Sequence, residues 1–234
     1  MRANKAIEIR TARQSDLDGI LELDHKVWVN FPASREMIAK RLAIFPEGNI
    51  IAIDKELGEI VGYLCLMFLE YEPIEFPNTW MDITGDGTTR THNPEGKYMY
   101  GVALTVAKGY SVGMELQVHG WVIGIKYRRR GCYLGSPIPR FAEYLKKHSG
   151  TTVEDYVFRI KASNSTPYDP ELAYYYKAGF KAVRILPNYE PDPKSLDHGV
   201  LVYCSNIFYH WPFRALVAWL VKKFGFRLLK ALGV

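Results

Sequence analysis

In the N-terminal part of this chain, a stretch of alternating hydrophobic and polar residues is followed by a stretch whose hydrophobic residues recur at helical spacing. Residues 6–10 (AIEIR) alternate, which predicts a strand, and residues 11–29 carry apolar side chains at helical intervals, which predicts a helix. A second helix is predicted after Ser34, a favourable N-cap. The runs 49–53 and 60–69 flank a polar turn and therefore predict an antiparallel hairpin.

The second half of the chain continues the mixture of strands and helices. Residues 98–106 (YMYGVALTV) predict a strong strand, and residues 112–128 predict a helix. The later elements are predicted as strands at 132–135, 180–186 and 200–204 and as helices at 153–162 and 170–178. Residues 70–97, rich in proline, glycine and small polar residues, predict a long loop, and such loops are more often functional than idle. The pattern indicates one α/β domain.

The net charge of +5 comes entirely from the C-terminal end. Residues 207–234 hold five basic and no acidic residues, so the first 206 residues carry 25 of each sign. We therefore predict a neutral domain over 1–206, without nucleic-acid binding, and a basic amphipathic helical tail over 207–234. Such a tail suits a membrane surface, and it equally suits packing across the domain or against a second copy in a homodimer.

The remaining composition predicts an ordinary cytoplasmic protein. Apolar residues make up 48% of the chain, and the three cysteines are far apart, which favours a reducing compartment. The first ten residues lack the apolar core of a signal peptide, and no run approaches the ~20 apolar residues that span a bilayer. None of the six histidines has metal-ligand spacing, so no metal is expected. The tail extends the expected location to the inner membrane surface.

Two segments resemble the GNAT superfamily of acyl-CoA N-acyltransferases. Residues 174–180 (YYYKAGF) look like its late helix and Gly-Phe turn. Residues 98–106, followed by a glycine-containing turn and a helix, look like its acyl-CoA segment. The resemblance implies a GNAT-like α/β fold with a mixed, mostly antiparallel twisted sheet flanked by helices. It also implies acetyl-CoA or another acyl-CoA as cosubstrate.

A closer likeness is to the GNAT domains fused to nitrilase-like carbon–nitrogen hydrolases. It runs from about Trp80 to Cys204, and no hydrolase partner is present in this chain. The segments that carry it are Thr79-Trp80, Ile83-Thr84-Gly85, His92-Asn93-Pro94-Glu95-Gly96, Tyr100-Gly101-Val102, Ile138-Pro139, Glu154-Asp155-Tyr156-Val157, Asp169-Pro170-Glu171-Leu172 and Leu186-Pro187-Asn188-Tyr189.

The family form of the pyrophosphate loop, Arg-x-x-Gly-x-Gly or a close variant, has two possible registers here. In the favoured one, residues 110–115, Gly113 fits, but Tyr110 replaces the arginine and Glu115 the last small residue. Backbone amides at a helix start still bind anions without those side chains. This register implies that acyl-CoA binds Leu104, Thr105, Val106, Ser111, Val112, Gly113 and Met114. The other register, residues 127–132, contains three arginines but must be followed by a helix containing Pro137 and Pro139.

The resemblance also implies catalytic and acceptor residues. Tyr175 occupies the position of the tyrosine that protonates the CoA thiolate in many GNAT enzymes. Ala103 stands where related domains carry an acidic residue, so the base is sought among Asp82, His92 and Glu95 in the long loop. Trp80 and Tyr100 are expected to line the acceptor pocket.

These features predict an N-acyltransferase, most simply an N-acetyltransferase, that moves an acyl group from acyl-CoA to an amine of a small molecule. Tyr110, Ala103 and Glu115 favour a degenerate GNAT domain that binds a ligand or partner without catalysis. The tail favours a membrane-surface acyltransferase with a longer acyl chain.

Overall fold

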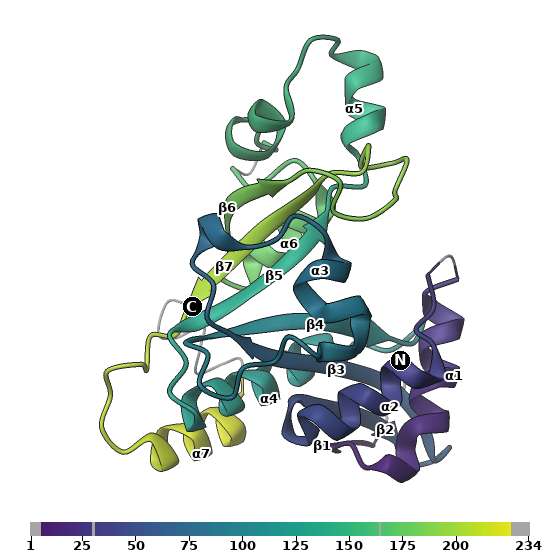
Figure 1. Cartoon of the computed structure of the whole chain (residues 1–234), viewed down its shortest axis with the longest axis vertical. Helices are drawn as coiled ribbons and strands as arrows, with labels where there is room; N and C mark the ends of the chain where they lie inside the picture. The colour runs from purple at the N-terminus through teal and green to yellow at the C-terminus, as the bar shows by residue number, and fades with distance from the viewer. Residues whose placement is uncertain (1–5, 30, 164, 226–234) are drawn as a thin grey trace.

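One twisted sheet of seven strands organises the molecule (Figure 1). The computed structural model describes residues 6–29, 31–163 and 165–225. Across the sheet the strands follow the order β1-β2-β3-β4-β5-β7-β6. Their bounds are β1 Ile7–Thr11, β2 Asn49–Asp54, β3 Glu59–Leu69, β4 Tyr98–Val106, β5 Gly131–Pro137, β6 Lys181–Leu186 and β7 Gly199–Ser205. Every neighbouring pair is antiparallel except β4 and β5, so the mixed, mostly antiparallel sheet is confirmed.

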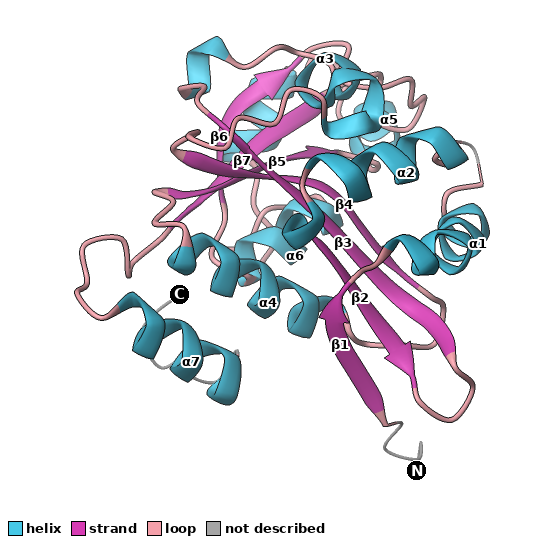
Figure 2. Cartoon of the chain, turned by 60° about the horizontal axis from the view of Figure 1, so that its bottom comes forward, coloured by secondary structure: helices cyan, strands magenta, loops and turns pink. Residues whose placement is uncertain are grey.

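Helices cover both faces of the sheet (Figure 2). The α-helices are α1 Leu17–Val27, α2 Arg35–Ile44, α3 Trp80–Thr84, α4 Gly113–Lys126, α5 Phe141–Lys147, α6 Pro170–Lys177 and α7 Arg214–Phe224. One core layer packs the sheet against α4, α6 and α7, and the other packs it against α1, α2 and α3. Strand β3 is buried from Val61 to Leu69, because it is central and covered on both faces.

The sheet splits into two arms between β4 and β5. The parallel pairing of these strands extends only over Met99–Gly101 and Cys132–Leu134. Beyond Gly101, β4 continues beside β3, whereas β5 continues beside β7. The pairing of β3 and β4 shifts at Val102, the extra residue of a β-bulge, which bends a strand and increases its twist. Figure 1 shows β5, β7 and β6 rising away from β3 and β4.

Several predicted elements differ from the structure. The first helix begins at Leu17, after a short helical turn at 14–16, and α5 was not predicted from sequence. The helix predicted over 153–162 is present but shorter, since residues 153–159 are helical and Asp155–Arg159 form a π-helical turn. The loop predicted over 70–97 contains α3 and a tight turn at Gly85–Thr89. Left-handed backbone at Gly85, Asp86 and Gly87 ends α3 after five residues, which is too short for helical periodicity to reveal.

The predicted tail helix is present over α7, and residues 226–234 lie outside the described part of the chain. Val217 and Val221 are buried in the core layer that contains α4. Figure 2 shows α7 lying beside α4. Leu216, Trp219 and Phe224 are each more than half exposed. Packing across the domain therefore accounts for one side of α7 only.

Candidate functional site

The two arms separate where the pairing of β4 and β5 ends, and the opening between residues 102–106 of β4 and residues 135–137 of β5 is called the wedge. It leaves backbone groups of β4 without a strand partner. Residues 102–106 have β3 on one side and no described strand on the other. In an antiparallel pair, alternate residues direct their N–H and C=O groups away from the partner strand. This edge can therefore pair with an extended ligand that carries amides. Leu104 and Val106 face the layer of α4, whereas Thr105 is buried toward α1.

The N-terminus of α4 lies directly beyond this edge. The helix begins at Gly113 without a side-chain cap, so the first amides are available to an anion. A Cβ on Gly113 would lie 3.2 Å from the Tyr174 hydroxyl, so glycine keeps the space open. Tyr174 itself reaches across the wedge from α6 and accepts a 3.1 Å hydrogen bond from the Gln117 amide. The predicted residues Ser111, Val112, Gly113 and Met114 are thus at one helix start.

Tyr110 and Glu115, the departures from the family loop, have clear positions. Tyr110 donates a 2.7 Å hydrogen bond to Asp54 at the end of β2, which ties the loop to the sheet. Glu115 is exposed in the first turn of α4. Its carboxylate is therefore near the helix start but screened by solvent.

The alternative loop register at 127–132 does not precede a helix. Residues 131–137 form β5, so the strand–loop–helix order occurs only at 98–126 in this region. Arg129 is buried, stacks on Phe68 and donates to the carbonyl oxygens of Pro94 and Gly96. It fixes the end of the long loop rather than facing an open anion site.

A cluster of tyrosines occupies the point where β4 and β5 separate. The Tyr100 and Tyr189 hydroxyls are 3.5 Å apart, and both rings are buried. Tyr175 on α6 is close enough to interact electrostatically with both tyrosines. Its pKa is raised, mainly by burial and to a smaller extent by the nearby Glu171 and Tyr174. A raised pKa keeps the Tyr175 phenol protonated at neutral pH, the state that donates a proton.

Two tryptophans flank the open part of β4 on the face covered by α1, α2 and α3. Trp80 donates a 3.1 Å hydrogen bond from its indole to the Val102 carbonyl at the bulge, and Trp28 donates one of 2.9 Å to the Thr105 hydroxyl. Ala103, between these two contacts, is partly exposed. The expected acceptor residues Trp80 and Tyr100 therefore both lie at the wedge. Trp28 was not predicted, since a tryptophan at a helix end carries no sequence signal of its own.

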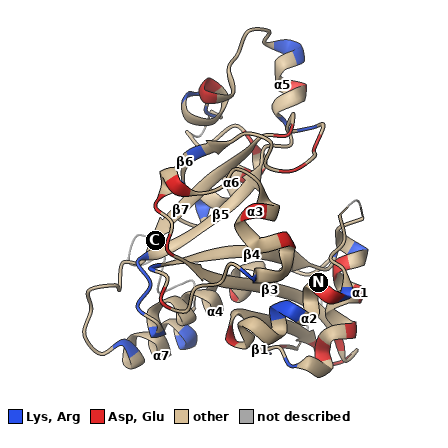
Figure 3. Cartoon of the chain, in the orientation of Figure 1, with Lys and Arg blue, Asp and Glu red and all other residues tan. Residues whose placement is uncertain are grey.

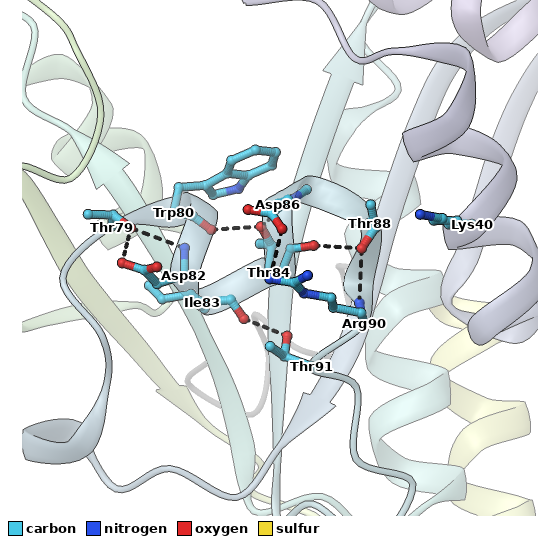
Figure 4. Close-up of polar contacts among 12 residues, drawn as sticks. Lys40, Thr79, Trp80, Asp82, Ile83, Thr84, Asp86, Thr88, Arg90 and Thr91 are labelled. Atoms are coloured by element: carbon cyan, nitrogen blue, oxygen red, sulfur yellow. Dashed lines mark hydrogen bonds and ion pairs between the residues drawn. The ribbon is translucent and has the colours of Figure 1, made fainter.

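Asp82 has a local structural contact. Its carboxylate accepts a 2.6 Å hydrogen bond from the Thr79 hydroxyl, which in turn accepts from the Asp82 amide. Figure 4 shows this pair at the start of α3, with the Trp80 indole projecting away from it. Such reciprocal contacts cap a helix, and Asp82 is exposed. The structure therefore gives Asp82 a capping position and no contact with the tyrosines.

His92 lies in the loop that precedes β4, beside Phe68 near the end of β3. Its Nδ1 accepts a hydrogen bond from the Phe68 amide at 3.0 Å, and its ring stacks on Phe45. Burial and the nearby Arg129 lower its pKa to about 4. His92 is thus neutral and engaged with backbone. The neighbouring Glu95 is exposed.

This pKa predicts an acid-sensitive contribution of His92 to stability. Because the folded pKa of about 4 lies below the ordinary 6.5, the unfolded chain binds the proton more tightly between these values. The free energy of unfolding should therefore fall as pH drops from 6.5 to 4, by roughly 2 kcal/mol for this partly exposed ring. Urea unfolding of wild type and His92→Asn at several pH values measures the difference. An equal acid slope in both proteins would contradict the prediction.

Tyr189 and Tyr174, which lie close to the predicted residues, were not themselves predicted as site residues. Tyr189 belongs to a quoted family segment, which is the one signal that pointed to it. Gly135 and Gly199 make room for its ring, since a Cβ on either would lie within 2.4 Å of it.

Among the described residues, no group of three or more histidine, cysteine or acidic side chains is arranged to hold a metal. No helix over the described ranges is long and apolar enough to cross a membrane.

No protein-family model matches the chain. Two curated relatives come from Bacillus subtilis. The "Probable hydrolase YhcX" is 30% identical over 213 residues, which covers 89% of this chain but only 40% of that protein. The "Uncharacterized N-acetyltransferase YkwB" is 26% identical over 216 residues, covering 88% of this chain and 91% of that protein.

Solved structures extend the likeness. The GNATL loading domain of CurA from Lyngbya majuscula has a TM-score of 0.71 at 19% identity and covers 86% of this chain and 98% of that one. The GphF GNAT-like decarboxylase in complex with isobutyryl-CoA has a TM-score of 0.68 at 23% identity, and the match covers 85% of this chain and 98% of that one. Naa20 from Chaetomium thermophilum, in complex with a bisubstrate analogue, has a TM-score of 0.53 at 16% identity, and the match covers 85% of this chain and 86% of that one. The chain therefore has the GNAT fold, as its sequence predicts.

Proposed function

We propose that this GNAT-fold chain binds acyl-CoA in the wedge and transfers the acyl group to an amine of a small molecule. The observation that carries the proposal is the open edge of β4 at 102–106, which leads directly to the uncapped start of α4 at Gly113. An extended pantetheine arm would pair with this edge, and the pyrophosphate would meet the helix amides. The thioester would then lie near the tyrosine cluster.

In this arrangement the residues of the wedge divide the chemistry. The amine attacks the thioester carbon, the carbon–sulfur bond breaks, and Tyr175 gives its proton to the departing thiolate. Tyr100 and Tyr189 place their own hydroxyls close to Tyr175. Trp28 and Trp80 flank Ala103, where the small side chain leaves space for the amine to approach. The proton lost by the amine passes to water, and the Tyr175 phenolate regains its proton from water.

Calorimetric titration with CoA and acetyl-CoA tests the proposal. We expect binding of both, with the wild-type chain saturating below millimolar ligand. Absence of binding at millimolar CoA would reject acyl transfer, and binding without turnover on any amine would favour the degenerate, non-catalytic alternative.

Removing the carboxylate at the start of α4 should tighten CoA binding. Glu115→Gln is expected to lower the dissociation constant about twofold to fivefold, because a negative charge in the first turn repels the pyrophosphate. Glu143→Gln is the matched control, since Glu143 also lies in the first turn of a helix, α5. The same titration measures both variants. Equal effects, or weaker binding in Glu115→Gln, would place the pyrophosphate elsewhere.

A second candidate reaction is the decarboxylation of an acyl-CoA that carries a carboxylate. It is favoured by the higher TM-score of the GphF decarboxylase, 0.68, than of Naa20, 0.53. The alanine at position 103 also agrees with it, since loss of carbon dioxide requires no base for an amine. Incubation with malonyl-CoA in the absence of any amine distinguishes the reactions, because only a decarboxylase would form acetyl-CoA.

The exposed side of α7 suits contact with an anionic membrane surface. Leu216, Trp219 and Phe224 are exposed beside Lys222 and Lys223, and Figure 3 shows this end of the molecule marked by basic residues. Aromatic and basic side chains together favour the interface of an anionic bilayer. A membrane-surface acyltransferase would use such a contact to reach a longer acyl chain.

Liposome flotation tests this contact. Full-length protein should float with phosphatidylserine-containing vesicles, and the variant Leu216→Gln/Trp219→Gln should float several-fold less, since it loses exposed apolar area. Ile74→Gln serves as the control, because Ile74 is 82% exposed and is far from α7 in the sequence. Equal flotation of all three proteins would exclude α7 as the contact and leave a homodimer as the alternative.

A further inference from the structure

Arg41 is a buried cation without an acidic partner. It lies in the last turn of α2 and is 2% exposed. Its Nε donates a 2.7 Å hydrogen bond to the Gly87 carbonyl, but Nη1 has no hydrogen-bond partner. The acids on the two flanking segments pair elsewhere, Glu36 with Lys40 and Asp86 with Arg90. An unpaired charge in the interior costs several kcal/mol, so its retention calls for an anion.

The guanidinium lies on the same face of the sheet as Trp80 and Ala103. Asn49, Cys65 and Ala103 are neighbours across β2, β3 and β4. The main-chain carbonyl of Arg41 accepts a hydrogen bond from the Asn49 side chain, and its guanidinium acts on the Tyr63 hydroxyl and the Cys65 thiol of β3. The third strand of the row carries Ala103, the partly exposed position between the two tryptophans.

Trp80 covers the arginine from the other side. The Arg41 guanidinium carbon lies 5.9 Å from the centre of the Trp80 ring. The edge of the same ring approaches Gly87, where a Cβ would be 2.8 Å from it. Figure 4 shows the turn after Trp80 braced by its own hydroxyl contacts, so the carbonyl that orients Arg41 is firmly placed. The cation is therefore fixed in position, and the Trp80 ring separates it from the bulge in β4.

We infer that Arg41 is the counter-ion for a carboxylate group of the substrate. The inference rests on the proposed function and narrows its substrate class to molecules with a free carboxylate. That carboxylate belongs either to an amino-acid-like acceptor or to the far end of a dicarboxylic acyl group. Because Nη1 is covered in this structure, the Trp80 ring must shift when the carboxylate binds. Charge-assisted hydrogen bonds of this kind discriminate strongly against neutral analogues.

Matched pairs of probes distinguish the two sources. One arm compares malonyl-CoA with acetyl-CoA, and the other compares the twenty amino acids with their amides, without CoA. Binding is followed by tryptophan fluorescence, with Trp80→Phe identifying the signal of Trp80, and by the shift in melting temperature. We expect a carboxylate to bind about tenfold to a hundredfold more tightly than its neutral partner in at least one arm.

Two substitutions of Arg41 complete the test. Arg41→Lys should keep part of the preference for the carboxylate, whereas Arg41→Met should abolish it. The methionine variant should melt near the wild-type temperature, because replacing an unpaired buried charge with an apolar side chain costs little. A preference that survives in Arg41→Met would overturn the inference. So would the absence of any preference in both arms.

The design separates this inference from the proposed function. If CoA itself fails to bind the wild-type chain, acyl transfer is rejected, yet the amino-acid arm still reports on Arg41. If CoA binds and neither arm prefers a carboxylate, acyl transfer stands and the role of Arg41 falls.

Discussion

Replacing Tyr175 with phenylalanine is expected to reduce the turnover of acyl transfer about 100-fold or more. The change removes one oxygen atom that lies within electrostatic reach of the Tyr100 and Tyr189 hydroxyls. A proton donor in the transition state contributes roughly 100-fold to 10,000-fold to a rate. Because the ring and its packing are kept, the Michaelis constant for acyl-CoA should change little. Steady-state kinetics with detection of the released thiol measures both parameters.

Two neighbouring tyrosines on the same helix are the controls for this substitution. Tyr176→Phe should leave both parameters unchanged, since Tyr176 is exposed on the outer side of α6. Tyr174→Phe removes the contact with Gln117 at the start of α4 and should alter CoA affinity rather than turnover. A turnover of Tyr175→Phe within a few-fold of wild type would mean that water or another group protonates the thiolate.

Replacing Gly135 with alanine is expected to destabilise the fold by about 3 kcal/mol, although it adds one methyl group. That methyl would lie 2.2 Å from the Tyr189 hydroxyl oxygen and 2.4 Å from the adjacent ring carbon. The ring has little freedom to move away, because a Cβ on Gly199 would contact it at 2.4 Å as well. Overpacking in a closely packed interior costs typically 1–3 kcal/mol and occasionally more. Urea denaturation at neutral pH measures the change.

A double-mutant cycle shows whether the ring of Tyr189 causes this loss. In the Tyr189→Leu background, Gly135→Ala should cost much less than in the wild type, since the ring that the methyl strikes is gone. Equal costs in both backgrounds would assign the effect to the backbone of β5.

Local patterns predicted most of the fold. The continuous apolar runs of β2 and β3 and the apolar residues of α4 identify these elements without reference to the rest of the chain. α3 was missed because Thr79 begins it and Gly85 ends it within five residues. α5 was missed because only Phe141 is fully buried, so the helix shows no wide apolar face.

The candidate site was less predictable, because its members meet only after the sheet has formed. Trp80 and Tyr100 were expected at the acceptor side, and both lie at the wedge. Asp82 and His92 were chosen for their chemistry, but neighbouring backbone and hydroxyl groups engage them. Arg41 stands in an ordinary helical stretch, and nothing in its local sequence shows that it is buried with its Nη1 atom unpaired.

The narrow junction between the two arms also affects how the chain is synthesised. The first arm uses residues 7–106, and its strands pair mainly with their neighbours in sequence. It can therefore assemble on the ribosome before β5, β7 and β6 are available. During that interval the whole outer edge of β4, including the Met99–Gly101 stretch that later pairs with β5, is exposed to other nascent chains, and unpaired edges promote aggregation. A molecule that occupies this edge, the role proposed for CoA, would act as a folding aid and raise the yield of folded protein.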